Sequence, residues 1–332
     1  MSVTGQVAGR IAEDSVTLGD VTAAAERIKV LARRTPVFTS TLFNRAAGVE
    51  AYFKCENFQR GGSFKIRGAA NFLLSLSDQE RRRGVVAFSS GNHAQGVAIA
   101  AAHLNVAATI VMPSDAPKAK LESVRAHGPK IVFYDRRTEN REEIARRRAN
   151  ESGAVTLPPY NHPWVIAGQA TAGLELLEQQ PDLEAIVTPL GGGGLLSGTL
   201  VAAKALRPDI RVFGVEPELA NDWALSLERG APVEIAPPAT IADGLRTPVP
   251  GDVTFPIVRS LVDGVVLVSE DEIRRTLRFL LTRMKMLAEP SGVVAAAAVL
   301  HEKLPGLRSI GIVVSGGNVD LDVLAAICGE EA

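Results

Sequence analysis

The chain has 332 residues, enough for two domains, and its 46% hydrophobic and 22% charged residues are typical of a well-packed globular protein. Its formal net charge of −1 excludes the overall positive field that recruits nucleic acid or anionic membranes, so neither is expected as a partner. Two cysteines, no membrane-length apolar run and no N-terminal signal segment exclude a disulfide scaffold and predict a soluble, cytoplasmic protein.

Segments with helical and strand patterns alternate in the first half of the chain. Apolar residues at helical spacing predict a helix over 18–31, and residues 51–55 have the composition of a short strand. Three more apolar segments are each followed by a helical pattern. The strands are expected at 85–90, 108–113 and 130–135, and the helices at 93–104, 118–128 and 139–153.

The second half of the chain repeats this alternation. Helices are expected at 165–179, 195–206, 271–287 and 291–304, and strands at 185–190, 211–217 and 309–314. The pattern predicts an α/β fold with two doubly wound domains and parallel-type sheets. Ligands of such sheets bind where loops leave the carboxyl ends of strands. Three glycine-containing motifs follow predicted strands, and each is therefore a candidate site.

A lysine stands between a glycine pair and the start of a helix in the segment from Gly61 to Gly68. The glycines permit backbone angles that can place Lys65 away from solvent. An ammonium among apolar neighbours loses hydration, so its pKa falls below about 10.4, and the neutral amine can form an imine with an aldehyde. The alternative is a surface lysine after a loop, and this segment alone does not decide between the two.

Four consecutive glycines, Gly191, Gly192, Gly193 and Gly194, lie between a predicted strand and a predicted helix. Their backbone N–H groups can converge, and the positive end of the helix adds to them, so the turn suits a phosphate dianion. It is not a Walker loop, and the dinucleotide spacing fails because Ser197 stands where the third glycine belongs. A turn selected only for packing is the alternative, but four glycines are entropically costly for that purpose.

Two further motifs follow predicted strands. One comprises Ser89, Ser90, Gly91, Asn92 and His93, and its backbone amides at a helix start suit a carboxylate. His93 in this position is more often structural than catalytic. In the other motif Ser315 presents a hydroxyl, for which capping of the next helix is the alternative role.

Taken in order, these motifs resemble the β-family (fold type II, tryptophan synthase β-like) pyridoxal-phosphate (PLP) enzymes, and within them the serine/threonine dehydratase and serine racemase group. The matching segments read FKCENFQRGGSFKIRGA, SSGNHAQGVA, VIAGQ, GGGGLLSG, IADG and VSGGNVD, and they extend from about Val21 to Asp320. The resemblance implies a large PLP-binding domain of residues 1–76 plus 161–332, a small domain of 77–160 above the active site, and a homodimer.

The resemblance also implies roles for individual residues. Lys65 would hold PLP and, once released, take the Cα proton, while Phe64 packs near the ring. Gly191, Gly192, Gly193 and Gly194 would bind the phosphate. Asn92 would bond the 3′-oxygen, and Ser315 the pyridine nitrogen. The substrate carboxylate would be bound by the loop of Ser89, Ser90, Gly91, Asn92 and His93, and catalysis is assigned to Lys65 and Ser90.

A divalent cation is a further expectation from the resemblance. In racemase-like members the positions of Glu216, Ala220 and Asp222 supply two carboxylates and a carbonyl, hard oxygen ligands that suit Mg²⁺, Mn²⁺ or Ca²⁺. The alternative is that both acids are solvated loop residues.

The predicted activity is β-elimination of water and ammonia from a small β-hydroxy amino acid such as L-threonine or L-serine. Ser90 matches the residue that protonates the opposite face of Cα in serine racemases, whereas aromatic Tyr160 resembles the dehydratases, so racemisation is an alternative activity. A 3-hydroxyaspartate is an alternative substrate. Its second carboxylate needs an additional cationic side chain, and the sequence does not show whether Arg141 or Arg246, for example, lies in the site. Because the chain ends soon after the last predicted strand, we expect no C-terminal regulatory domain.

Two other function classes remain. A catalytically silent binding protein of the same fold would lack turnover. A nicotinamide-dependent oxidoreductase is disfavoured because no predicted strand is followed by G-x-G-x-x-G.

Overall fold

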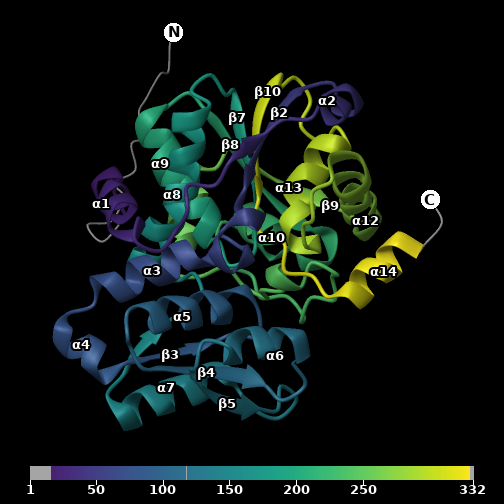
Figure 1. The fold of residues 1–332 in the computed structure, drawn as a ribbon. Helices are drawn as coiled ribbons and strands as arrows, with labels where there is room; N and C mark the ends of the chain where they lie inside the picture. The colour runs from purple at the N-terminus through teal and green to yellow at the C-terminus, as the bar shows by residue number, and fades with distance from the viewer. Residues whose placement is uncertain (1–15, 117, 330–332) are drawn as a thin grey trace.

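Two sheets form the framework of the protein, one above the other in Figure 1. The computed structural model describes residues 16–116 and 118–329, so the expectations on the first fifteen residues and the last three lie outside it. The larger sheet has the strand order β1-β2-β10-β7-β8-β9. Its strands are β1 (Val37–Phe38), β2 (Glu50–Cys55), β7 (Ala185–Pro189), β8 (Arg211–Pro217), β9 (Gly264–Val268) and β10 (Ser309–Val314).

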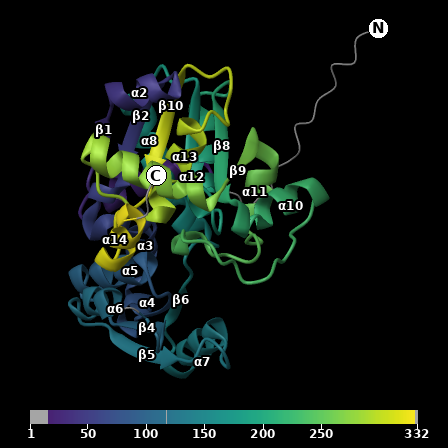
Figure 2. The ribbon, with the colours of Figure 1, turned by 90° about the vertical axis from the view of Figure 1, so that its right-hand side faces the viewer.

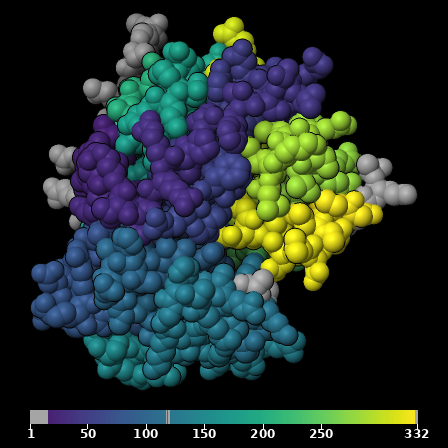
Figure 3. All heavy atoms as spheres, in the orientation of Figure 1, coloured from purple at the N-terminus to yellow at the C-terminus, as the bar shows by residue number. Residues whose placement is uncertain are grey.

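The smaller sheet has the order β5-β4-β3-β6 and is parallel throughout. Its strands are β3 (Val85–Phe88), β4 (Ala108–Pro113), β5 (Lys130–Tyr134) and β6 (Val155–Leu157). The side view in Figure 2 shows the same two tiers. In the space-filling view of Figure 3 the blue-to-teal lower lobe adjoins the purple N-terminal and yellow C-terminal parts of the upper one.

Helices cover both faces of each sheet. In the larger unit they are α1 (Leu18–Ile28), α2 (Thr41–Ala47), α8 (Pro163–Gln179), α9 (Gly194–Leu206), α10 (Asp222–Arg229), α11 (Thr254–Leu261), α12 (Glu270–Phe279), α13 (Pro290–Leu300) and α14 (Leu321–Gly329). Around the smaller sheet lie α3 (Lys65–Ser75), α4 (Asp78–Arg83), α5 (Asn92–His103), α6 (Lys118–Arg125) and α7 (Arg141–Ser152). Short 3₁₀ turns occur at Glu56–Phe58, Arg60–Gly62, Glu218–Ala220 and Asp243–Leu245.

The composition of α13 explains its central position. The helix begins with Pro290, whose missing N–H is unneeded in a first turn. Apart from Ser291 and the final Leu300, its other residues are small or β-branched and apolar, and all but Leu300 are buried. Such a helix, apolar on every side, is stable only inside a core, and α13 packs against β7, β8, β9 and β10.

The predicted α/β class with doubly wound, parallel-type sheets is confirmed, and the differences from the predicted elements are local. The short edge strand β1 is antiparallel to β2. The helix expected over 271–287 ends early: after α12 the chain makes a π turn (Leu280–Met284), and Lys285 has a left-handed φ of 59°. This wider turn lets Leu280 and Met286 both reach the core. The proposed domain boundaries stay a prediction. Among the described residues no helix has the length and apolar character needed to cross a membrane.

Candidate active site

One cavity between the two sheets collects the predicted cofactor and substrate residues. It is lined by Phe64, Lys65, Ser89, Ser90, Gly91, Asn92, His93, Gly191, Gly192, Gly193, Gly194 and Ser315. Three of these groups directly follow the carboxyl ends of β3, β7 and β10, where ligands of parallel sheets bind. The structure therefore brings the motifs together, while the role of each residue stays a prediction.

Lys65 is the first residue of α3, and its side chain extends into the cavity. Gly61 and Gly62 precede it with φ values of 75° and 70°, a left-handed backbone that favours glycine. The Lys65 Nζ donates to the Pro159 carbonyl at 2.8 Å and lies 5.2 Å from the centre of the Phe64 ring. Withdrawal from solvent lowers the pKa of Lys65 to about 8. The amine is thus more often neutral than an ordinary lysine, as imine formation requires.

The four-glycine turn has no space for side chains. A Cβ on Gly192 would overlap the Tyr160 ring, and one on Gly193, whose φ is 88°, would lie 2.5 Å from Trp223. The thirteen-residue helix α9 begins at Gly194, so its first N–H groups have no acceptor within the helix. Bare backbone donors at a helix start fit a phosphate, and the lysine amine in the same cavity fits an aldehyde.

The segment from Ser89 to His93 forms the entry into α5. Asn92 donates from Nδ2 to Glu289 at 2.6 Å and accepts from Asn318 at 2.8 Å. His93 is buried, its Nε2 lies 3.2 Å from the Leu157 carbonyl, and burial lowers its pKa to about 3. A neutral, enclosed imidazole matches the expectation that His93 is structural or binds substrate and is not the general base.

Ser315 is placed beside the lysine segment by backbone contacts. Its carbonyl accepts the Phe64 N–H at 3.1 Å, and Ser63 forms an antiparallel bridge with Gly316. Because these bonds join the end of β10 to the start of α3, Ser315 and Lys65 line the same cavity. Only 4% of Ser315 is exposed, so its hydroxyl is shielded from bulk water.

Sequence reasoning missed Glu289, a buried acid on the same cavity. Burial raises its pKa to about 8, so this carboxyl is largely protonated at neutral pH. It accepts from Asn92, and a Cβ on Gly316 would overlap its Oε1. The only sequence signal was an acid just before a helix of apolar residues, which resembles an ordinary first-turn charge.

Cationic side chains besides Lys65 also line the cavity, and they differ in their partners. Lys120 forms an ion pair with Asp243. Arg246 donates from Nε and Nη2 to the Thr240 carbonyl at 2.8 and 2.6 Å. Arg141, the first residue of α7, stacks over Phe88 at 5.8 Å. Within residues 16–116 and 118–329 no carboxylate is within ion-pair distance of Arg141, which leaves its charge free for a ligand.

The predicted metal residues lie beside the glycine turn. Glu216 accepts backbone N–H groups of Trp223 at 3.3 Å and Ala224 at 2.9 Å, whereas Asp222 Oδ2 has no partner among the described residues. Burial raises the pKa of Glu216 to about 8 and that of Asp222 to about 7. Two buried acids with one bare oxygen fit a cation. No group of three or more His, Cys, Asp or Glu side chains suited to a metal occurs in the described part, so the site stays a prediction.

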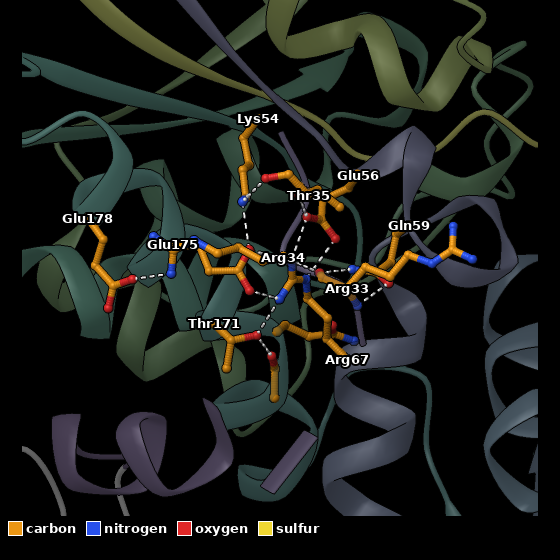
Figure 4. Close-up of polar contacts among 12 residues, drawn as sticks. Arg33, Arg34, Thr35, Lys54, Glu56, Gln59, Arg67, Thr171, Glu175 and Glu178 are labelled. Atoms are coloured by element: carbon orange, nitrogen blue, oxygen red, sulfur yellow. Dashed lines mark hydrogen bonds and ion pairs between the residues drawn. The ribbon is translucent and has the colours of Figure 1, made fainter. Parts of the chain in front are cut away.

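A buried ion-pair network fixes the start of α3 (Figure 4). Arg67, two residues after Lys65, contacts both oxygens of Glu56 at 2.7 and 2.8 Å and both oxygens of Glu175 at 2.7 and 2.8 Å. Lys54 adds a bond of 2.6 Å to Glu175. The network joins β2, α3 and α8 and holds the backbone that carries the lysine.

Comparison with known proteins adds a family and its relatives. The family model described as "Pyridoxal-phosphate dependent enzyme" matches residues 28–316. The chain is 50% identical to the L-threo-3-hydroxyaspartate ammonia-lyase of Pseudomonas sp, over 93% of this chain and 97% of that protein. Among solved structures it resembles maize serine racemase, with TM-score 0.91, 42% identity and coverage of 94% and 96%. The threonine deaminase of T.th. has TM-score 0.87, 45% identity and coverage of 92% and 99%.

Proposed function

Because the chain belongs to the family of pyridoxal-phosphate dependent enzymes, as its motifs indicated, we propose that it removes water and ammonia from a small β-hydroxy amino acid. L-Threonine and L-serine are the first candidate substrates. The observation that carries the proposal is that the Lys65 amine and the Gly191–Gly194 turn open on one cavity. The names of its relatives, an ammonia-lyase, a serine racemase and a threonine deaminase, support the same class of chemistry.

The proposed reaction uses three features of the chain and the bound cofactor. Backbone N–H groups of the Ser89–His93 segment hold the substrate carboxylate at the start of α5. The Lys65 Nζ, with a pKa near 8, takes the Cα proton. When bound, PLP supplies an electron-withdrawing ring that stabilises the negative charge left at Cα. The two walls of the cavity exclude bulk water, and the β-hydroxyl then leaves as water with the proton that Lys65 took from Cα. Hydrolysis of the released product gives a 2-keto acid and ammonia.

Serine racemisation is the alternative activity. Ser90 lies on the same cavity as Lys65, so its hydroxyl is a candidate for proton delivery to the opposite face of Cα. Elimination and racemisation begin with the same proton transfer to Lys65 in this proposal. They differ in whether the β-hydroxyl leaves before Cα is protonated again.

A second substrate candidate, 3-hydroxyaspartate, is favoured by Arg141. Its guanidinium lines the cavity with Ser90 and Tyr160 and has no ion-pair partner among the described residues. A planar guanidinium binds a carboxylate through two parallel hydrogen bonds. Arg246 is less suitable because it already donates to the Thr240 carbonyl.

An assay of three substrates tests both candidates. L-Threonine, L-serine and L-threo-3-hydroxyaspartate would give 2-oxobutyrate, pyruvate and oxaloacetate, which are distinguishable products. If Arg141 binds a second carboxylate, Arg141→Met lowers kcat/KM about 10- to 100-fold for hydroxyaspartate and much less for serine. Arg246→Met is the matched control. Equal losses on both substrates would reject Arg141 as the specificity residue.

The covalent role of Lys65 has a separate test. Borohydride treatment of the yellow protein should bleach it and leave the reduced cofactor covalently attached to Lys65. The variant Lys65→Ala should retain the circular-dichroism spectrum of the wild type but lose turnover. A labelled protein that forms no keto acid from any of the three substrates would indicate a catalytically silent binding protein. We also propose a divalent cation at Glu216, Ala220 and Asp222 and a homodimer, both from the family resemblance. A cytoplasmic location is proposed from the two cysteines without a paired motif.

A further inference from the structure

We propose that Trp223 couples the acid pair of Glu216 and Asp222 to the glycine turn, so that cation binding and cofactor binding strengthen each other. The inference rests on the proposed cofactor site and on the proposed cation at Glu216 and Asp222. It assigns Trp223 as a positioning residue, because its side chain reaches the turn from behind and does not line the cavity.

The indole of Trp223 supports the turn directly. Its Nε1 donates to the Gly191 carbonyl at 2.5 Å. Its Cζ2 packs so close to Gly193 that a Cβ on that residue would be only 2.5 Å from it. Thr254 supports the same turn through a 2.9 Å bond from Oγ1 to the Gly192 carbonyl. Because these two bonds hold carbonyls of the turn, the direction of its N–H groups depends on the position of the indole.

The backbone of Trp223 belongs to the acid pair. Its N–H and that of Ala224 donate to the two oxygens of Glu216, and Asp222 is the residue just before it. Glu216 and Trp223 have no exposed surface, and Asp222 is 1% exposed. Because dense packing surrounds all three, a change in the position of the Glu216 carboxylate must move the backbone that carries the indole.

The consequence is a thermodynamic linkage. A cation between Glu216 and Asp222 would fix the first turn of α10, and through the indole it would fix the Gly191 carbonyl. PLP would then bind to a turn that is already ordered. Linkage is reciprocal, so PLP must raise the affinity for the cation by the same factor. Allosteric couplings are typically about 5- to 150-fold, and we expect a value on the order of tenfold.

A purely structural role for Trp223 makes a different prediction. If the indole only fills the core, its loss lowers stability and weakens PLP binding equally with and without cation. Only a coupling residue changes the ratio of the two affinities. That ratio is therefore the quantity to measure.

The experiment titrates the full chain, freed of PLP, with PLP at equilibrium and follows the visible absorbance. Titrations with saturating Mg²⁺ and with a chelator give the two dissociation constants. We expect Mg²⁺ to tighten PLP binding on the order of tenfold in the wild type. In Trp223→Phe, which keeps the aromatic packing and the backbone bonds to Glu216, the Mg²⁺ effect should fall below about twofold. Trp164→Phe is the matched control and should retain the full effect.

An Mg²⁺ effect in Trp223→Phe equal to that of the wild type would overturn the coupling, as would its absence from the wild type. If Trp223→Phe fails to fold, Trp164→Phe supplies a second measurement. The sequence has two tryptophans, so Trp223 is the one that remains in this variant and reports by fluorescence. Mg²⁺ should change its fluorescence in the PLP-free protein, and unchanged emission would refute the link. No visible band in the wild type would instead reject the proposed cofactor, and the coupling with it.

Discussion

Replacement of Arg67 by methionine tests whether the buried ion-pair network stabilises the protein. Methionine preserves much of the volume and removes the charge. Arg67 is fully buried, as is Glu56, and Glu175 is only 16% exposed at its side chain. The wild-type network balances two cations, Arg67 and Lys54, against these two carboxylates. The variant would leave two buried carboxylates facing Lys54 alone.

The expected loss of stability is about 3–5 kcal/mol, the usual cost of removing one partner from a buried ion pair. With an unfolding entropy of about 2.1 cal/mol/K per residue, that corresponds to a fall in Tm of about 4–7 °C for a chain of 332 residues. The adjacent pair of Arg34 and Glu178 in Figure 4 is the matched control, because its side chains are 54% and 47% exposed. Exposed pairs contribute about 0–1 kcal/mol, so Arg34→Met should change Tm little.

The loss should also depend on pH. Burial alone would raise the pKa of Glu56, but Arg67 and other neighbours lower it below its usual value. A carboxyl with a lowered pKa stabilises the fold above its unfolded pKa, near 4.5, and this contribution is lost as pH falls. Without Arg67 the pKa of Glu56 rises, and the carboxyl can take a proton. The difference between wild type and Arg67→Met should therefore shrink as pH falls toward about 5.

Circular-dichroism melting in saturating PLP, at about pH 7.5 and about pH 5.5, measures these effects. A double variant, Arg67→Met with Glu56→Gln, should be more stable than Arg67→Met alone, because one carboxylate and Lys54 remain in balance. The reasoning is refuted if Arg67→Met melts no lower than Arg34→Met, or if the double variant loses the sum of both single losses.

Three further predictions concern the active site. The rate at which PLP attaches to the PLP-free chain can be followed by absorbance. It should rise with pH until about 8 and then level, because Lys65, with a pKa near 8, must be neutral to react. A rate that still rises steeply at about pH 10 contradicts the lowered pKa. Ser90→Ala should keep keto-acid formation and lose any serine racemisation in a chiral assay; persistent racemisation would exclude Ser90 as the second acid. Chelator should lower Tm if Glu216 and Asp222 hold a cation, and an unchanged Tm counts against that site.

The strands whose limits the sequence predicts best have a largely apolar sequence. The limits of β4, β8 and β10 agree with the expected 108–113, 211–217 and 309–314, because most residues of each strand are buried in a sheet covered by helices. Elements with weak local signals were not predicted. The strand β1 has two residues, and α2, α10 and α11 have seven or eight, too few for a clear period.

The candidate site was predictable where its chemistry lies in local motifs. Lys65, the glycine turn and Ser315 follow strands or precede helices, so topology alone brings them together. Glu289 and Arg67 were not found because their roles depend on contacts with residues distant in the sequence. Arg67 meets Glu175 at a separation of 108 residues, and Trp223 meets Gly191 at a separation of 32. Single residues without a spacing pattern give no signal for such contacts.

The charge balance of the network has a consequence for Lys65. Arg67 stands only two residues from Lys65, and an unpaired guanidinium so close would lower the pKa of the amine further. Its charge is balanced by Glu56 and Glu175. Desolvation is the largest influence on the pKa of Lys65, and Glu289 opposes it only to the extent that its carboxyl is ionised. The chain thus separates two tasks. A neutral buried network fixes the backbone, while the cavity wall sets the reactivity of the amine, so substitutions in the wall can retune the amine without unfolding its support.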